Sequence, residues 1–197
     1  EEAQVEDTFG EYPPFALTGY KTGGYCVSAS NHQSGNYYPW EAFDTIAGGD
    51  AVGWYSSSLG TYNGTGGLVS STSTTRLAPE TEKGEWLQLE FPSNFHLNYF
   101  ILYSQSYGAT TNTPDNFIVY AKKNSSDTWT SLGTHTGTAA GQSAAGYTGT
   151  VDGSEVYKYF AIVVTKRHSQ ASDYGVAIRE LKLYGHKEGD LTRFPEP

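Results

Sequence analysis

The chain has 197 residues, a formal net charge of −9, 16 tyrosines, 23 glycines and a single cysteine, Cys26. The negative charge argues against nucleic acid or an anionic membrane surface as a partner, because both need clustered lysines and arginines. No run approaches the roughly 18 apolar residues of a membrane span, and one cysteine permits no internal disulfide. Length and composition therefore indicate one all-β domain with many turns and its own core.

The N-terminal part of the sequence predicts a tail, a strand and a compact turn. Residues 1–11 carry five acids and few apolar side chains, so we expect a tail there. The absence of an initiator methionine suggests that an upstream segment was removed, as in a secreted or surface protein. Alternation over 25–29 predicts a short strand. Residues 39–44 predict a turn in which two aromatic side chains close one end of the fold and Asp44 organises backbone amides.

The stretch 84–106 carries the strongest strand signal in the chain. Over residues 86–91, apolar and polar side chains alternate, which is typical of a half-buried strand. Residues 99–103 are apolar on both faces, which predicts a central strand covered on each side. Because Pro92 and polar residues separate the two patterns, we predict two strands joined as a hairpin.

The rest of the chain alternates small-residue loops with strands. A loop at 59–83 is too long for an ordinary connection, and such loops usually carry function or disorder. A second loop is predicted at 133–149. Strands are expected at 116–123, 157–166 and 177–184. The expected core residues are Trp86, Leu89, Phe100, Phe117, Phe160 and Ile162. Sequential strands with turn clusters indicate a β-sandwich or barrel over 12–185, followed by a tail at 186–197.

An ordered set of short motifs carries a family resemblance. The motifs are YPPFALTGY, GYCVSAS, PWEAFD, GWYS, GEWLQLEFP, FILYS, PDNFIVYAKKNSSDTWTSLG, YFAIVVTK and IRELKLYG. Together they resemble the discoidin family, also called the coagulation-factor C-type domain, within the galactose-binding-like superfamily. The sequence is most similar to divergent versions in surface proteins of algal viruses and aquatic microbes. The resemblance implies a non-catalytic jelly-roll sandwich of two antiparallel sheets that binds sugars, lipids or proteins through loops at one end.

The resemblance also implies a calcium site beside the predicted turn. Relatives use a carboxylate there, backbone carbonyls, a threonine two residues before the next tryptophan and a glutamate of the last strand. Asp44 and Glu180 match the carboxylates, whereas the threonine position is Val52, which has no side-chain oxygen, and Asp50 could replace it. The alternative is that Asp44 only caps the turn and Glu180 pairs with a nearby cation.

Catalysis is not expected from the sequence. His168, Ser169 and Asp173 are the residue types of a hydrolase triad, but neighbours along an extended segment point to opposite faces. No nucleophile elbow accompanies them, and no carboxylate pair of a glycosidase can be identified. The five histidines lack the spacing of a zinc site.

Two non-enzymatic functions remain. The favoured one is a structural or adhesion subunit on a cell or virion surface, which forms a homo-oligomer or filament through its tails. Its expected assembly contacts are Phe9, Phe15 and Phe194. Asn63 and Asn124 stand in glycosylation acceptor tripeptides, which suit an extracellular coat protein.

The alternative is a secreted, lectin-like module, in which aromatic rings stack on sugars and polar side chains hold their hydroxyls. The candidate glycan contacts are Tyr37, Tyr38, Tyr62, Arg76, Tyr107, Arg167 and His168.

Overall fold

The longest strand, β5 (Glu85–Tyr103), joins the two layers of the fold. The computed structural model describes residues 8–33, 35, 37–47, 53–56, 61–69, 77, 83–104, 112–138, 145–168 and 175–188. The other strands are β1 (Gly10–Tyr12), β2 (Lys21–Thr22), β3 (Tyr25–Ala29), β4 (Trp54–Tyr55), β6 (Pro114–Lys122), β7 (Thr130–His135), β8 (Tyr147–Thr150), β9 (Tyr157–Arg167), β10 (Ala177–Ile178) and β11 (Glu180–Lys187). A short 3₁₀ helix, η1 (Pro39–Phe43), occupies the predicted compact turn.

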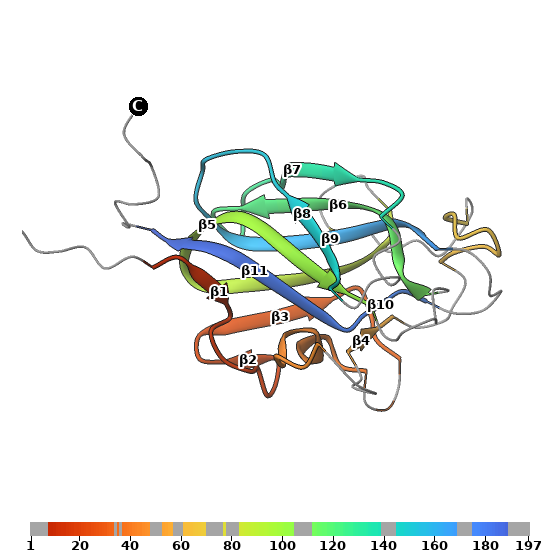
Figure 1. Ribbon diagram of the computed structural model, residues 1–197, viewed down its shortest axis with the longest axis horizontal. Helices are drawn as coiled ribbons and strands as arrows, with labels where there is room; N and C mark the ends of the chain where they lie inside the picture. Colours follow the sequence, from red (N-terminus) through yellow and green to blue (C-terminus); the bar gives the residue numbers. More distant parts are fainter. Residues whose placement is uncertain are drawn as a thin grey trace, which may run out of the picture.

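Each half of β5 belongs to a different layer. The first half pairs with β3 and β9, and the second half pairs with β8 and β11, always antiparallel. β9 then pairs with β6, and β6 with β7, while β1 pairs with β11 and β2 with β3. The result is the predicted all-β sandwich of antiparallel strands, to which β4 and β10 add a small two-stranded sheet (Figure 1).

The predicted hairpin within β5 is wrong. The chain bends at Pro92–Asn94 but stays extended, and the two halves take separate partners. A tight hairpin turn needs residues with positive φ, and none of these three has one. The prediction that 99–103 is covered on both faces is also wrong. Tyr99, Ile101 and Tyr103 are only partly buried, because no further layer covers that face in the described part of the chain.

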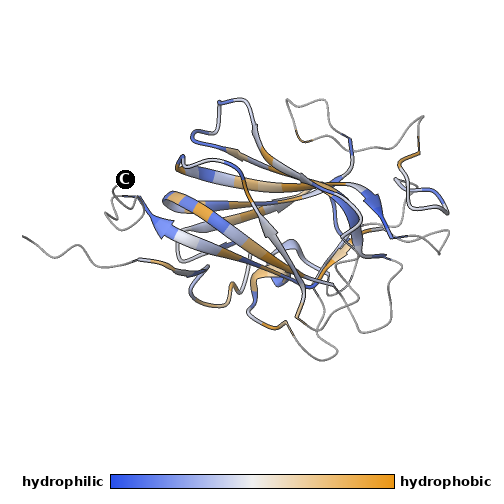
Figure 2. Cartoon of the chain, turned by 45° about the horizontal axis from the view of Figure 1, so that its top comes forward, coloured by the Kyte–Doolittle hydropathy of each residue, from blue (hydrophilic) through white to orange (hydrophobic). Residues whose placement is uncertain are grey.

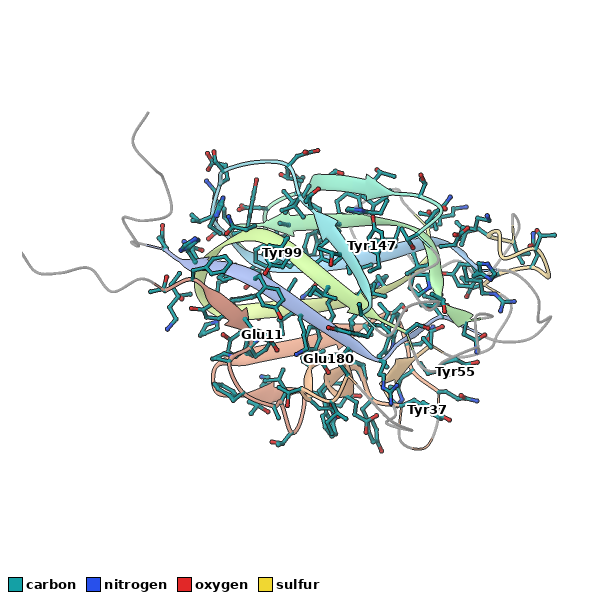
Figure 3. All side chains as sticks on the ribbon, viewed as in Figure 1. Glu11, Tyr37, Tyr55, Tyr99, Tyr147 and Glu180 are labelled. Atoms are coloured by element: carbon teal, nitrogen blue, oxygen red, sulfur yellow. The ribbon has the colours of Figure 1, made fainter. Side chains whose placement is uncertain are left out.

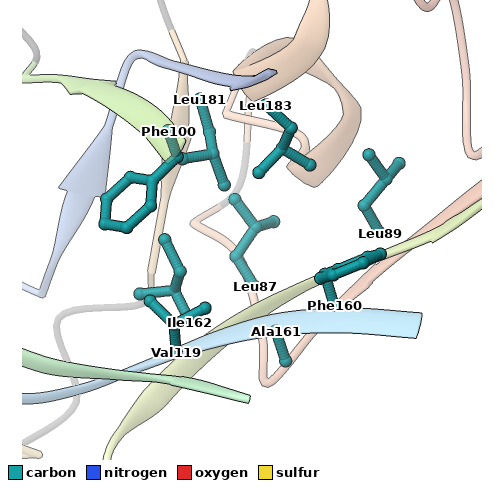
Figure 4. Close-up of a pocket in the computed structure, with 9 residues that line it drawn as sticks. All are labelled: Leu87, Leu89, Phe100, Val119, Phe160, Ala161, Ile162, Leu181 and Leu183. Atoms are coloured by element: carbon teal, nitrogen blue, oxygen red, sulfur yellow. The ribbon is translucent and has the colours of Figure 1, made fainter. Parts of the chain in front are cut away.

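The core lies between the two layers. Alternation along the strands puts Leu87 and Leu89 of the first half of β5 opposite Phe100 of the second half (Figure 4). These side chains and their neighbours surround an apolar cavity of about 10 Å³, which is at the lower limit for one water molecule. Figure 2 shows hydrophobic and hydrophilic residues in alternating bands along several of the strands. All the expected core residues are buried except Trp86, which lies half-buried on the outer face of β5.

Strands extend into both of the predicted tails. β1 already starts at Gly10, so residues assigned to the N-terminal tail form an edge strand against β11. Glu11 explains this pairing, because its carboxylate accepts a hydrogen bond from the Tyr184 hydroxyl at 2.8 Å and lies 2.9 Å from the Lys182 ammonium. β11 continues to Lys187, two residues into the predicted C-terminal tail.

Candidate functional site

The loops at one end of the sandwich lie opposite the end where β1 starts and β11 finishes (Figure 1). We call this the loop end. Its described residues follow β3, surround β4, precede β5 and β6, and follow β9. They are Ser30–Gln33, Tyr37, Trp54–Ser56, Thr61–Val69, Glu85, Ser104, Asn112–Thr113, Lys166–His168 and Gly175–Ala177. We call the opposite end, where β1 starts and β11 finishes, the terminal end.

A buried carboxyl group organises the loop end. Glu85, the first residue of β5, accepts hydrogen bonds from the hydroxyls of Ser30 and Thr61 and from the Asn31 side-chain amide, the last at 2.8 Å. The Asn31 main-chain oxygen in turn accepts a hydrogen bond from the Trp54 indole at 2.8 Å. The Glu85 side chain thus holds two separate segments directly and, through Asn31, the segment of Trp54, and a buried polar group with several partners fixes their relative positions.

A buried guanidinium holds the next loop. Arg167 is fully buried at the end of β9, and its side chain lies 3.4 Å from both the Asn112 side-chain oxygen and the Asn63 main-chain oxygen. The main-chain N–H of Arg167 donates to Gly66 at 2.9 Å. Gly66 has a φ of +84°, and a Cβ at this position would lie 2.0 Å from the Arg167 carbonyl oxygen. Only glycine therefore fits where this loop crosses β9.

Aromatic side chains form a strip that runs from the β2–β3 edge to the loop end. We define the aromatic strip as Tyr20, His32, Tyr38 and Trp40. The Tyr38 ring is central: its centroid lies 5.2 Å from that of His32, 6.0 Å from that of Trp40 and 6.4 Å from that of Tyr20. Tyr20 is 43% exposed, and the other three are partly exposed. Beside the strip, Tyr37 packs on Tyr55 with ring centroids 5.3 Å apart (Figure 3).

Polar groups accompany the rings of the aromatic strip. The Glu41 carboxyl group accepts a hydrogen bond from the Tyr38 N–H at 3.1 Å, and burial raises its pKa. Burial also raises the pKa of the Tyr20 hydroxyl, with smaller contributions from Tyr38 and Glu41. Exposed ring faces beside a carboxyl group, an imidazole and hydroxyls can stack on an apolar surface and hydrogen-bond to hydroxyl groups.

No family model and no curated protein matches the sequence. Solved structures do match, with low sequence identity. The module CBM32-3 from a family 31 glycoside hydrolase of Clostridium perfringens has a TM-score of 0.56 at 12% identity, covering 84% of this chain and 99% of that one. A family 32 carbohydrate-binding module from NanJ of the same organism, in complex with galactose, has a TM-score of 0.55 at 13% identity, covering 82% and 93%.

A third match is the C-terminal domain of a chitobiase from Bacteroides fragilis, with a TM-score of 0.57 at 14% identity, covering 84% of this chain and 95% of that domain. Each of the three comparisons covers more than four fifths of this chain. The chain has the galactose-binding-like fold. The fold that the resemblance to discoidin domains predicted is therefore confirmed. The similarity to surface proteins of algal viruses stays a prediction.

On this galactose-binding-like fold, the predicted glycan contacts fall into three groups. Tyr37 and Tyr38 lie at the loop end and on the aromatic strip, and His168 lies half-buried after β9. Tyr62 and Arg167 are buried, so the structure removes them from the list of surface contacts. Both act structurally instead: the Tyr62 hydroxyl donates to the Val164 oxygen at 2.7 Å. The remaining candidates, Arg76 and Tyr107, lie outside the described residues.

The residues of the candidate site that sequence reasoning missed are Glu85 and three members of the aromatic strip. The burial of Glu85 could have been predicted from the sequence. Residues 85, 87, 89 and 91 share one face of a strand, and this face points inward. Tyr20, His32 and Trp40 gave no such signal, since their proximity to Tyr38 depends on how η1 packs beside β2 and β3.

The two predicted calcium carboxylates lie together. Glu180 is buried, accepts a 3.3 Å hydrogen bond from the Thr45 N–H, and has one carboxyl oxygen, Oε2, without a hydrogen-bond partner in the described part of the chain. Burial, with a contribution from Asp44, raises the pKa of Glu180 to about 9. Asp44 accepts a hydrogen bond from the Ile46 N–H at 2.9 Å, and burial raises its pKa too. Calcium prefers oxygen ligands, and two neighbouring carboxyl groups supply such oxygens.

The described residues contain no cluster of three or more histidine, cysteine, aspartate or glutamate side chains that could hold a metal ion. A calcium ion would therefore need main-chain oxygens and Asp50, which lies outside the described residues. Ser169 and Asp173, the two residues considered with His168 as a hydrolase triad, also lie outside the described residues. Among the described helices, none has the length and apolarity to cross a membrane.

The remaining predicted sites lie on the surface where they are described. Asn63 and Asn124 are exposed in turns, and their glycosylation stays a prediction. Phe9 is 46% exposed and touches His186, while Phe15 is 42% exposed and packs edge-on against Tyr25. Phe194 lies outside the described residues. Assembly through these phenylalanines stays a prediction that neither the fold nor the comparisons test.

Proposed function

We propose that this chain is a non-catalytic glycan-binding module that acts outside the cell and contacts sugars through the aromatic strip at its loop end. The observation that carries the proposal is the cluster of partly exposed rings around Tyr38, with Glu41 and His32 beside them. Several solved structures with the same fold are carbohydrate-binding modules, which supports the assignment. It replaces the self-assembling coat subunit that the sequence favoured, since the similar structures support glycan binding instead.

The mechanism follows from the chemistry of sugars. A pyranose ring has one apolar face of C–H groups, which packs on an aromatic ring, and hydroxyls around its edge, which need hydrogen-bond partners. Tyr38 and Tyr20 supply the rings. Glu41 supplies an acceptor, and His32, whose Nδ1 donates to the Gln33 main-chain oxygen at 2.9 Å, supplies its other ring nitrogen, Nε2. Because Glu85 and Arg167 already fix the adjacent loops, little ordering free energy is lost on binding.

The test is a titration of the full chain with the sugars that the similar structures carry: galactose, N-acetylgalactosaminyl-β-1,3-galactose and chitotriose. Tyr38→Ala and Tyr20→Ala should each weaken binding by about tenfold, because an aromatic contact at the centre of an interface dominates its affinity. Phe9→Ala is the matched control, since it removes an exposed ring at the terminal end. Failure of the wild-type chain to bind any sugar of the panel, or equal binding by Tyr38→Ala and Phe9→Ala, would contradict the proposal.

We further propose that calcium binds between Asp44 and Glu180, with Asp50 as an additional ligand. The support is the unpartnered, buried Glu180 oxygen beside a second carboxyl group. An ion there would be structural, since it would tie the end of η1 to the start of β11. Calcium should raise the melting temperature of the wild-type chain but leave Glu180→Gln unchanged, whereas an equal shift in both chains would exclude this site.

A further inference from the structure

The turn at residues 63–67 is a rigid part of the loop end. Its main chain is closed by two hydrogen bonds: Gly66 N–H donates to the Asn63 oxygen at 2.9 Å, and Asn63 N–H donates to the Gly67 oxygen at 2.7 Å. Arg167 holds the same turn against β9, as described above. The first three residues of the turn are nevertheless exposed to solvent.

Within this turn the two polar atoms of the Asn63 side chain differ in their hydrogen bonding. Its carbonyl oxygen accepts three hydrogen bonds: from the Thr65 N–H at 2.9 Å, from the Thr65 hydroxyl at 2.7 Å and from the Gly67 N–H at 3.1 Å. Its amide nitrogen, Nδ2, donates to no group in the described part of the chain, and neither does the main-chain N–H of Gly64. Apart from the two neighbouring residues, no described heavy atom lies within 4 Å of where a Cβ of Gly64 would be, so this side of Gly64 is open to solvent.

From this geometry we propose that Asn63 is a site of spontaneous deamidation. The Gly64 nitrogen loses its proton to solvent and attacks the Asn63 side-chain carbonyl carbon, so a new C–N bond closes a five-membered ring. The negative charge that develops on the carbonyl oxygen is stabilised by the three donors already directed at it, as in an oxyanion hole. Nδ2 takes up a proton from water and leaves as ammonia, which gives a succinimide.

Water then adds to one of the two succinimide carbonyls and opens the ring. The products are aspartate or isoaspartate at position 63, and the net change is the loss of ammonia and the gain of water. An aspartate keeps the same three donors as partners for its new negative charge, which favours retention of the turn. An isoaspartate adds one carbon to the main chain, which breaks the hydrogen bond between Asn63 N–H and Gly67.

Asn124 provides an internal comparison. It is equally exposed and also stands in a glycosylation tripeptide, but its amide nitrogen donates to the Asp127 carboxylate at 2.9 Å. The next residue is Ser125, whose side chain hinders attack by its own main-chain nitrogen. A carboxylate beside Asn124 would also oppose the developing negative charge. The structure therefore predicts that Asn63 reacts and Asn124 persists, although the two tripeptides are equivalent as sequence motifs.

Deamidation and glycosylation at Asn63 exclude each other, because both act on the same nitrogen. A glycan on Nδ2 removes the leaving group, whereas loss of Nδ2 as ammonia removes the acceptor. The reaction should thus be seen in chains made without glycosylation, and it adds one negative charge at the loop end.

The test uses the full chain made in a bacterial host and aged in mildly alkaline buffer containing ¹⁸O-labelled water. Peptide mass spectrometry should find the label in the peptide that contains residue 63, as a mixture of aspartate and isoaspartate, before it appears at residue 124. Gly64→Ala should slow the reaction strongly. Thr65→Val keeps the shape of the side chain but removes one donor, and should slow the reaction by about threefold to tenfold, the rate equivalent of one net hydrogen bond.

The outcomes separate the proposal from a reaction of any exposed Asn-Gly pair. Equal labelling at residues 63 and 124 would overturn it, and so would an unchanged rate in Thr65→Val. Circular dichroism of each variant before ageing confirms that the fold is present, so a slower reaction can be attributed to the altered turn.

Discussion

The two ends of the sandwich are closed by different chemistry. At the terminal end, aromatic rings pack on one another: Phe95 lies 4.5 Å from Phe91 and 4.8 Å from Tyr12, measured between ring centroids. At the loop end, buried polar groups close the fold, with Glu85 and Arg167 each binding several loops. Apolar packing closes an end without presenting any group to a ligand. Polar closure holds loops in place while their outward side chains stay available, so we place binding at the loop end.

The largest expected effect is at the terminal end. Phe95→Ala removes a ring that is 1% exposed and is surrounded by other rings, so we expect a loss of about 3–5 kcal/mol in the free energy of unfolding. Denaturant titration measures this loss. Sugar binding by the folded fraction should stay unchanged. A loss below about 1 kcal/mol would mean that the rings do not close this end.

Glu85→Gln is the corresponding change at the loop end. The substitution keeps size and one acceptor but turns the second oxygen into a donor, which then faces other donors. We expect a loss of about 1–3 kcal/mol in the free energy of unfolding, since a buried polar group is left unsatisfied. Sugar affinity should fall as well, unlike in Phe95→Ala. Unaltered affinity in both variants would show that the loops do not need Glu85 for their binding geometry.

A third prediction concerns pH. The folded pKa of Glu180 is raised to about 9 from its usual 4.5, so between these values the folded chain holds a proton that the unfolded chain has lost. The free energy of unfolding should therefore fall as pH rises through this range. Glu180→Gln should flatten this decline in urea titrations at several pH values without added calcium. Glu188→Gln, at an exposed position, is the control and should behave like the wild-type chain.

The smallest effect is expected midway between the two ends. Val119→Ile adds one methyl group beside the cavity of about 10 Å³. The change in unfolding free energy should lie within about 1 kcal/mol, because the gain from burying a methyl group offsets local crowding. Thermal unfolding measures it. A loss of several kcal/mol would mean that the cavity cannot accept a methyl group.

The terminal end was more predictable from sequence than the loop end. Alternation identified the inward residues of the first half of β5, because burial on one face leaves a period of two in the sequence. β9 was recognised by its hydrophobicity, since residues 160–164 are all buried and leave no period of two. It did not reveal which strands pair, so the two halves of β5 were predicted to pair with each other. Pairing depends on contacts between residues far apart in the chain, such as Glu11 with Lys182.

At the loop end, residue type alone was misleading. Arg167 and Tyr62 have the side chains of surface binding residues, yet both are buried and support loops. Their roles depend on hydrogen bonds to main-chain atoms of other segments, which leave no pattern in the sequence. Tyr38 is partly exposed and stays a predicted glycan contact, while the aromatic strip around it is built from three segments of the chain that hold Tyr20, His32 and the pair Tyr38 and Trp40.

The pairing of β1 with β11 also has a mechanical consequence. The two strands are antiparallel and begin and end at the same side of the molecule, with Gly10 opposite Gly185. A load that pulls the two termini apart therefore separates their hydrogen bonds one pair after another instead of shearing all of them at once. Under tension the terminal end should open first and at low force. The loop end, held from within by Glu85 and Arg167, should keep its shape until the sandwich itself gives way.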